Sequence, residues 1–123
     1  MPFAKNAEQI LKDAEVVART NLETQKIHNA IEDLSYLGED SKQTITIFIP
    51  QNASLFCFSD KISFDANILQ EPFPAQCPQG KCTKIYSSRI SITCAVNEIR
   101  GPAKEELVLE RKTNSVSLAI KGD

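Results

Sequence analysis

The first third of the chain carries a helical pattern of hydrophobic positions. Between Pro2 and Leu37 apolar residues recur at steps of three and four, which is the spacing of one helix face. That stripe consists of Ile10, Leu11, Ala14, Val17, Ala18, Leu22, Ile27, Ile31 and Leu34, and polar residues interrupt it in the middle, at Asn21, Thr24 and His28. Charged residues are expected on the opposite face, at Lys12, Asp13, Glu15, Arg19, Glu23, Lys26, Glu32 and Asp33.

No proline or glycine interrupts the run from Phe3 to Leu37, and Gly38 stands where a left-handed C-cap would end a helix. The pattern therefore predicts one helix over Pro2–Leu37, with two helices broken near Asn21 as the alternative. One such helix would be about 50 Å long. Because a domain of this size needs less for its own core, we expect the N-terminal half to project and to seek a partner.

After Gly38 the pattern changes to short strands. Thr44–Ile49 is β-branched and alternating, and Pro50 ends it. A long loop is predicted at 67–82, because prolines and a glycine gather there without periodicity. Further strands are predicted at Leu55–Phe58, Ile62–Phe64, Lys84–Ser87, Arg89–Val96, Leu107–Arg111 and Val116–Ile120.

This order predicts an α+β fold, in which a long N-terminal helix packs on an antiparallel β-sheet. Short connections favour a meander. The helix would occupy residues 1–38 and the sheet residues 39–123, with the end of the helix, from Ile27 to Leu37, covering one sheet face. The two parts would form a single structural domain.

The composition of the chain reduces the number of functional classes that need to be considered. The chain has 123 residues and a net charge of −2, without a basic patch, so nucleic acid is not an expected partner. No apolar run is long enough to cross a membrane, and no secretory leader begins the chain. Met1 is read as a supplied initiator, because Pro2 onward resembles the interior of a longer protein.

The four cysteines, Cys57, Cys77, Cys82 and Cys94, suggest disulfides and an oxidising compartment. Three connectivities are possible, and we prefer Cys57–Cys94 with Cys77–Cys82. In that pairing one bridge crosses between strands and the other closes the turn around Gly80. Four zinc-binding thiolates are the alternative, although the tight C-x-x-C spacing is absent.

No catalytic, cofactor-binding or metal-binding residue is predicted, and we expect a protein that is not an enzyme. Phosphate-binding loops, nucleophile elbows and metalloprotease motifs are missing. His28 is interpreted as a packing residue, and the acidic pairs Glu39/Asp40 and Glu105/Glu106 as solvated surface. Asn52 begins an Asn-Ala-Ser triplet, which makes it a possible N-glycosylation site in an exported chain.

From Ile27 to Pro50 the chain resembles archaeal type IV pilin-like proteins that carry a class III signal peptide. The likeness consists of I-x-x-A-I-x-x-L-x-x-L-G, a polar link and T-I-T-I-F-I-P, with Gly101 and LVLERKTNSVSLAI near the end. Its positions in the first motif are Ala30, Ile31, Leu34, Gly38, Ser41, Ile45, Ile47, Ile49 and Pro50. The likeness covers roughly two-thirds of the chain.

The resemblance implies a cell-surface structural subunit of a type IV pilus or related filament, membrane-anchored in its full-length parent. Its partners would be other pilin-like subunits, met through the N-terminal helix, and it would use no cofactor. The family's peptidase site and apolar helix half are absent here, and its shared pattern includes neither the cysteines nor the loop at 67–82. Two alternatives stay open: an exported binding module that uses this loop, and a small enzyme or zinc protein that uses the cysteines.

Overall fold

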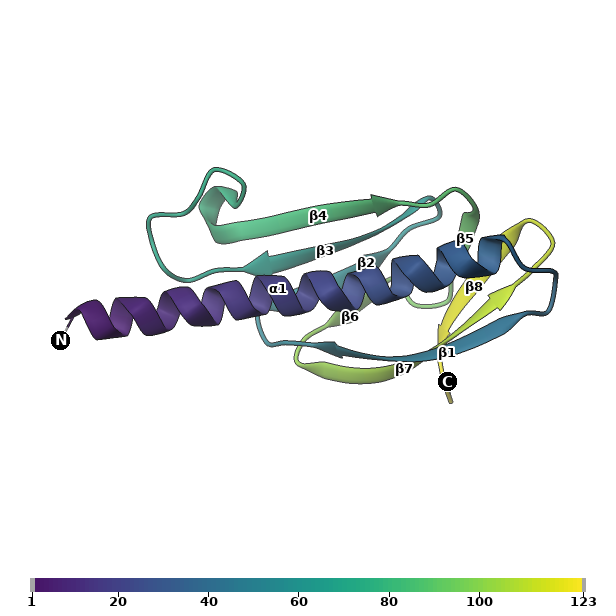
Figure 1. Cartoon of the computed structure of the whole chain (residues 1–123), viewed down its shortest axis with the longest axis horizontal. Coiled ribbons are helices and arrows are strands. Elements are labelled where there is room, and N and C mark those ends of the chain that lie inside the picture. The colour runs from purple at the N-terminus through teal and green to yellow at the C-terminus, as the bar shows by residue number, and fades with distance from the viewer. Residues whose placement is uncertain (1, 123) are drawn as a thin grey trace.

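The computed structural model describes the backbone of residues 2–122 and the side chains of residues 7–122. One helix, α1 (Pro2–Ser35), runs through the whole N-terminal third without a break. This confirms the single helix over two helices broken near Asn21. Its N-terminal end extends past the strands (Figure 1).

The helix ends slightly earlier than the sequence pattern suggests. Tyr36 and Leu37 donate backbone hydrogen bonds three residues back, to Asp33 and Leu34, which tightens the last turn. Gly38 does not adopt a left-handed conformation, whereas Asp40 has φ 70°. The predicted glycine C-cap is therefore wrong, and the chain reverses through the turn around Asp40 instead.

Eight strands follow the helix. They are β1 (Lys42–Ile49), β2 (Ala53–Cys57), β3 (Lys61–Asn67), β4 (Lys81–Ser87), β5 (Ser91–Cys94), β6 (Glu98–Arg100), β7 (Ala103–Arg111) and β8 (Ser115–Ile120), with a 3₁₀ turn, η1 (Pro78–Gly80), before β4. Every predicted strand is present, although the bounds shift and β6 was not predicted. The loop at 67–82 is confirmed except at its ends, which belong to β3 and β4.

The strands form two four-stranded sheets, in the orders β1-β7-β8-β5 and β4-β3-β2-β6. All pairs are antiparallel except β5 with β8. The α+β class with a helix on antiparallel-rich sheets is confirmed. A simple meander is wrong, because β1 pairs with β7 and the chain passes repeatedly between the sheets.

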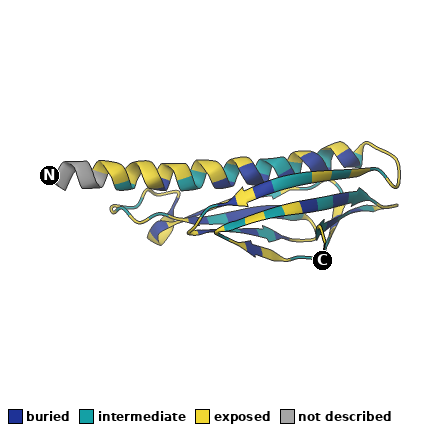
Figure 2. Ribbon diagram, turned by 90° about the horizontal axis from the view of Figure 1, so that it is seen from below, coloured by how far each residue is buried: buried dark blue, intermediate teal, exposed yellow. Residues whose placement is uncertain are grey.

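The core lies between the second half of α1 and the sheets. Ile27, Ala30, Ile31 and Leu34 are buried against strand residues that include Ile47, Leu55, Ile62, Phe64, Leu107, Leu109, Val116 and Leu118. Leu37, which was expected to cover the sheet, is 48% exposed because it follows the end of the helix. The core therefore anchors only part of α1, and the dark-blue buried positions concentrate there in Figure 2.

Candidate functional site: the outer face of the helix

The two halves of α1 place their hydrophobic residues on opposite sides. Ile27 is fully buried, whereas Ile10, Leu11 and Leu22 are 55%, 63% and 50% exposed. At about 100° per residue, the five-residue step from Leu22 to Ile27 turns the stripe by about 140° around the helix. The single stripe predicted from the sequence therefore divides in two: Ile10, Leu11 and Leu22 face away from the sheets, whereas Val17 is half-buried against the core.

Polar side chains take the sheet-facing positions in the first two-thirds of the helix. Asp13, Thr20, Glu23 and Thr24 are all buried. The Thr20 and Thr24 hydroxyls donate to the carbonyls of Val16 and Thr20 at 2.6 and 2.7 Å, so neither is left without a partner. The expectation that Asp13 and Glu23 lie on a solvated face is wrong.

The Glu23 carboxylate provides a hydrogen-bond acceptor for a backbone N–H at the edge of a sheet. β1 lies at the edge of its sheet, and the Phe48 N–H donates to the Glu23 carboxylate at 2.6 Å. Lys26 Nζ lies 2.9 Å from the same carboxylate and balances its charge. A buried N–H without a partner is costly, so a carboxylate is favoured here over an apolar residue.

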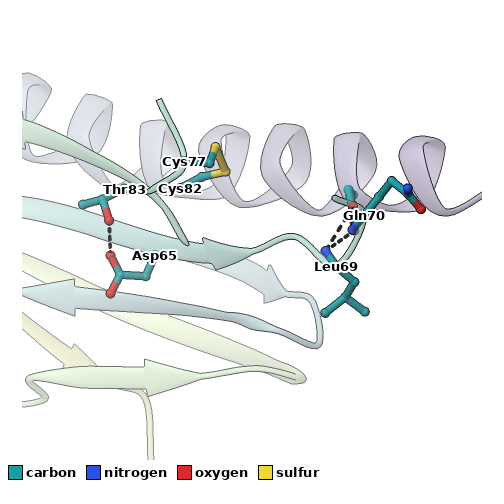
Figure 3. Close-up of a disulfide and its surroundings, with 7 residues drawn as sticks. Asp65, Leu69, Gln70, Cys77, Cys82 and Thr83 are labelled. Carbon is teal, nitrogen blue, oxygen red and sulfur yellow. Dashed lines mark hydrogen bonds between the residues drawn. A yellow bond between two sulfur atoms is a disulfide. The ribbon is translucent and has the colours of Figure 1, made fainter. Parts of the chain in front are cut away.

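The Asp13 carboxylate likewise accepts backbone N–H groups, here from the loop that follows β3. This carboxylate accepts the Leu69 N–H at 3.1 Å and the Gln70 N–H at 3.0 Å (Figure 3). It also accepts a hydrogen bond from the Gln9 side-chain amide at 2.8 Å. Burial raises the pKa of this carboxyl, but the hydrogen bonds from Gln70, Gln9 and Leu69 outweigh burial and hold the pKa below its usual value. The carboxylate thus ties the loop to the projecting half of the helix.

A disulfide closes the other end of this loop. Cys77 and Cys82 are bonded across η1, and the Ile68 N–H donates to the Gly80 carbonyl at 2.7 Å. Gly80 has φ +81°, a conformation that side-chain-bearing residues rarely adopt. The predicted pinning of the loop by the two cysteines is confirmed, whereas the contribution of Asp13 could not be read from the sequence.

We expect Asp13→Asn to lower the free energy of unfolding by about 1–2 kcal/mol, because an amide presents one acceptor oxygen where a carboxylate presents two. Hydrogen exchange at the Leu69 and Gln70 amides should accelerate. The exposed Asp33→Asn on the same helix is the control and should change neither quantity. Unchanged exchange at both loop amides in Asp13→Asn would contradict the assignment.

The hydrogen bonds to the Asp13 carboxylate also make the stability of the folded protein depend on pH. Since the pKa of Asp13 is lower in the folded protein than in the unfolded chain, its stabilisation is complete above the unfolded value of about 3.9. It is lost as pH falls through the lower folded value. Thermal unfolding between about pH 5 and pH 2 should therefore show a smaller acid-induced loss in Asp13→Asn than in the wild type.

A shallow groove lies on each side of the projecting helix. One, of about 930 Å³, is bounded by Ala14, Phe64 and the prolines Pro72 and Pro74 of the loop. The other, of about 1170 Å³, is bounded by Arg19, Phe48, Leu69 and Lys104, among others. The helix therefore stands as a ridge between them.

A defined apolar surface, here called the outer stripe, runs along this ridge and consists of Ile10, Leu11, Ala14, Ala18 and Leu22. Ile10, Ala14 and Ala18 also line the 930 Å³ groove, and Ala18 and Leu22 line the other. All five side chains are exposed. Single exposed apolar residues are ordinary, but five on one helix face form a continuous patch, and such patches mark interaction surfaces. The outer stripe is the strongest candidate site in the described residues.

The cysteines pair as preferred from the sequence, Cys57 with Cys94 and Cys77 with Cys82. With every cysteine of the chain in a disulfide, no thiolate is left to hold zinc, and the cysteine-ligated zinc alternative is overturned. Two disulfides indicate an oxidising, extracellular environment. Within residues 2–122, no helix is both long and apolar enough to cross a membrane.

The remaining candidate residues lie apart from the outer stripe. His28 Nε2 lies 3.0 Å from the Ser87 carbonyl, and its ring contacts Tyr86, so the packing interpretation is confirmed. Asn52 is exposed at a turn with φ 71°. Glu39, Asp40 and Glu106 are exposed and Glu105 is half-buried, and these acidic residues do not form one cluster with His28.

No family model matches this chain, and no curated protein or solved structure proves similar to it. Function must therefore be argued from the arrangement of the residues themselves.

Proposed function

We propose that this chain is the extracellular domain of a pilin-like structural subunit, anchored to the membrane and assembled at the cell surface through its N-terminal helix. The single observation that carries the proposal is the outer stripe. An exposed apolar helix face opposite the sheets is costly for an isolated domain, and becomes favourable when another subunit covers it.

Three further features support this role. The projecting helix rests on buried carboxylates rather than on a large core, which leaves its apolar side free for a partner. The disulfides suit a domain outside the cell, where no reducing system maintains thiols. The likeness of Ile27–Pro50 to archaeal pilin-like proteins gives the same answer from the sequence.

The first test is the coding sequence upstream of Pro2. The proposal expects a short basic leader followed by about 20 apolar residues, enough to cross a membrane. A gene whose reading frame opens at Met1, without an apolar segment, would overturn it.

The second test changes the outer stripe in the genomic copy. Leu11→Glu with Leu22→Glu should leave the domain folded and exported, because both side chains are exposed, but remove it from the filament fraction sheared from cells. Ile85→Glu is the matched control, since Ile85 is 54% exposed on β4 and should assemble normally. Recovery of the doubly substituted protein in filaments at the wild-type level would contradict assembly through this face.

A second candidate function is an exported binding module. The specific observation in its favour is the 930 Å³ groove, whose loop wall is fastened at both ends by Asp13 and by the Cys77–Cys82 disulfide. A rigid, mostly apolar groove of this size suits a small ligand. Saturable binding of a hydrophobic dye, lost in Ala14→Arg but kept in Ile85→Arg, would favour this function over the structural one.

A further inference from the structure

We propose that the free side of β4 binds an extended segment of a different polypeptide, which pairs with it as an additional antiparallel strand. The binding surface consists of outward-pointing backbone groups of Lys81, Thr83 and Ile85, here called the β4 edge. It does not include the outer stripe, and the proposal goes beyond the structural role proposed above.

The strand register shows which backbone groups of β4 point outward. In an antiparallel ladder, residues that bond to the neighbouring strand alternate with residues whose backbone groups point the other way. Beyond one end of β4 the Ile68 N–H donates to the Gly80 carbonyl at 2.7 Å, and beyond the other the Ser88 N–H donates to the Asp60 carbonyl at 2.8 Å. The even-numbered residues of β4 therefore bond to β3, and residues 81, 83, 85 and 87 point away from it.

Contacts within the chain limit the β4 edge at both ends. His28 Nε2 lies 3.0 Å from the Ser87 carbonyl, which agrees with an outward direction for that group. At the start of the strand the Lys81 N–H donates to the Pro78 carbonyl within η1. Between these contacts, the backbone groups without a partner among the described residues are the Lys81 carbonyl and the N–H and carbonyl groups of Thr83 and Ile85.

The other edges of the two sheets are less open. At β1 the helix occupies the place of a further strand, because its buried Glu23 carboxylate accepts the Phe48 N–H. At β5 the Ser59 carbonyl accepts the Ile92 N–H at 2.8 Å, and β6 is only three residues long. Strand β4 has seven residues and runs along the margin of the molecule, with no strand beyond it in the described part of the chain (Figure 1).

An extended backbone is the ligand that fits such a row of groups. Along one side of a strand the outward-pointing residues repeat every two positions, or about 6.8 Å, and another strand matches this repeat along its whole length. An antiparallel partner exchanges a pair of hydrogen bonds with Thr83 and another pair with Ile85. The backbone therefore specifies the conformation of the partner independently of its sequence.

The side chains beside the β4 edge restrict the sequence of the partner. Ile85 is 54% exposed on the sheet face away from α1 and favours a β-branched residue opposite it. Lys84 is exposed on the other face, with Nζ 5.2 Å from the Tyr86 ring centroid, and favours an acidic residue. The Thr83 hydroxyl donates to Asp65 at 2.6 Å, which holds this side chain toward β3 (Figure 3).

A second copy of β4 fits the β4 edge poorly. When two copies pair antiparallel about a two-fold axis in the middle of the strand, Lys84 lies opposite or diagonally beside Lys84 of the other copy. Like charges at these positions destabilise a sheet. The partner is therefore a different polypeptide, with an acidic residue among β-branched ones, and filament assembly through the outer stripe keeps its separate test.

A synthetic peptide, acetyl-Thr-Val-Glu-Thr-Val-Thr-amide, tests the proposal. In the antiparallel register its glutamate lies opposite Lys84, its first valine opposite Ile85 and its middle threonine opposite Thr83. Amide NMR of the disulfide-bonded chain should give a dissociation constant of about 1 mM or tighter. Hydrogen exchange should slow at the Thr83 and Ile85 amides, whereas the Lys84 and Tyr86 amides, which already bond to β3, should change little.

Methylated peptides test the strand pairing on the unaltered protein. Methyl groups on the nitrogens of the first valine and the middle threonine remove the two donors that face β4 and should weaken binding by about tenfold or more. Methyl groups on the nitrogens of the glutamate and the second valine, which face away from β4, should change the affinity by less than about threefold. Lysine in place of the glutamate should weaken binding by at least about threefold.

A substitution tests the edge from the protein side. Thr83→Pro removes an outward N–H without removing a hydrogen bond to β3, so the variant should fold and lose the peptide-induced changes. Thr83→Val is the matched control, because it loses the hydroxyl bond to Asp65 but keeps the N–H, and it should bind like the wild type.

Three results would overturn the proposal. The first is the absence of any amide shift at peptide concentrations up to about 5 mM. The second is equal binding of the two doubly methylated peptides, which would place the peptide elsewhere, and this comparison holds even if Thr83→Pro does not fold. The third is a chain that dimerises without peptide and protects its own Thr83 and Ile85 amides, which would make a second copy the partner.

Discussion

Replacing Cys57 and Cys94 with alanine is expected to lower the free energy of unfolding by about 4 kcal/mol, the largest effect of any substitution considered for this protein. The bond joins β2 in one sheet to β5 in the other and closes a loop with a sequence separation of 37. A long cross-linked loop restricts the unfolded chain strongly, and this bridge also connects the two sheets.

The Cys77–Cys82 bridge provides the matched comparison. Its sequence separation is only 5, so the same argument gives about 2 kcal/mol for Cys77→Ala with Cys82→Ala. Urea unfolding of the two double variants, with the wild type as reference, measures both losses. Equal losses, or a larger loss for the short bridge, would contradict the loop-closure explanation.

Replacing Gly101 with alanine is expected to cost about 3 kcal/mol. A Cβ at this position would stand 1.9 Å from the Pro50 carbonyl oxygen and 3.0 Å from that of Ile49. Gly101 lies where the chain passes from β6 to β7, directly against the passage from β1 to β2, and its N–H donates to the Ala53 carbonyl at 2.8 Å. Because the obstructing atoms belong to the backbone, no side-chain rotation relieves the clash.

Gly38 is the control for this substitution. Nothing lies within 4 Å of a Cβ built there, and its φ is not positive. Gly38→Ala should therefore leave stability unchanged or raise it slightly, by up to about 1 kcal/mol. Thermal unfolding of both variants measures the two effects on stability. A Gly101→Ala variant as stable as Gly38→Ala would mean that the β1–β2 and β6–β7 connections do not lie in contact.

Local patterns predicted the elements well because they depend on near neighbours. The run from Phe3 to Leu37, without proline or glycine and with apolar residues at steps of three and four, favours helix, and the alternation of Thr44–Ile49 favours a half-buried strand. The proline-rich composition at 67–82 excluded regular structure in the same way. These elements were correct to within a few residues at their ends.

The pairing of the cysteines, the pairing of the strands and the orientation of the helix faces were harder to predict from the sequence. The sequence left three disulfide connectivities possible, and only the approach of β2 to β5 selects Cys57 with Cys94. Strand order was missed because β1 pairs with β7, more than fifty residues away, and no local pattern encodes that partner. One feature of the sequence indicated the outer stripe: the five-residue step from Leu22 to Ile27, which interrupts the spacing of three and four residues between apolar positions.

The sequence by itself determined that this protein is a long helix followed by short strands, with an irregular loop, cysteines suited to an oxidising compartment, and no motif of known catalytic chemistry. Only the tertiary structure decided which side of the helix faces outward. Periodicity places residues around a helix axis but carries no information about what lies beside that axis. The N–H groups of Phe48, Leu69 and Gln70 bind the carboxylates of Glu23 and Asp13 on the sheet side of the helix, and this leaves the exposed apolar residues of the first half on the outward side.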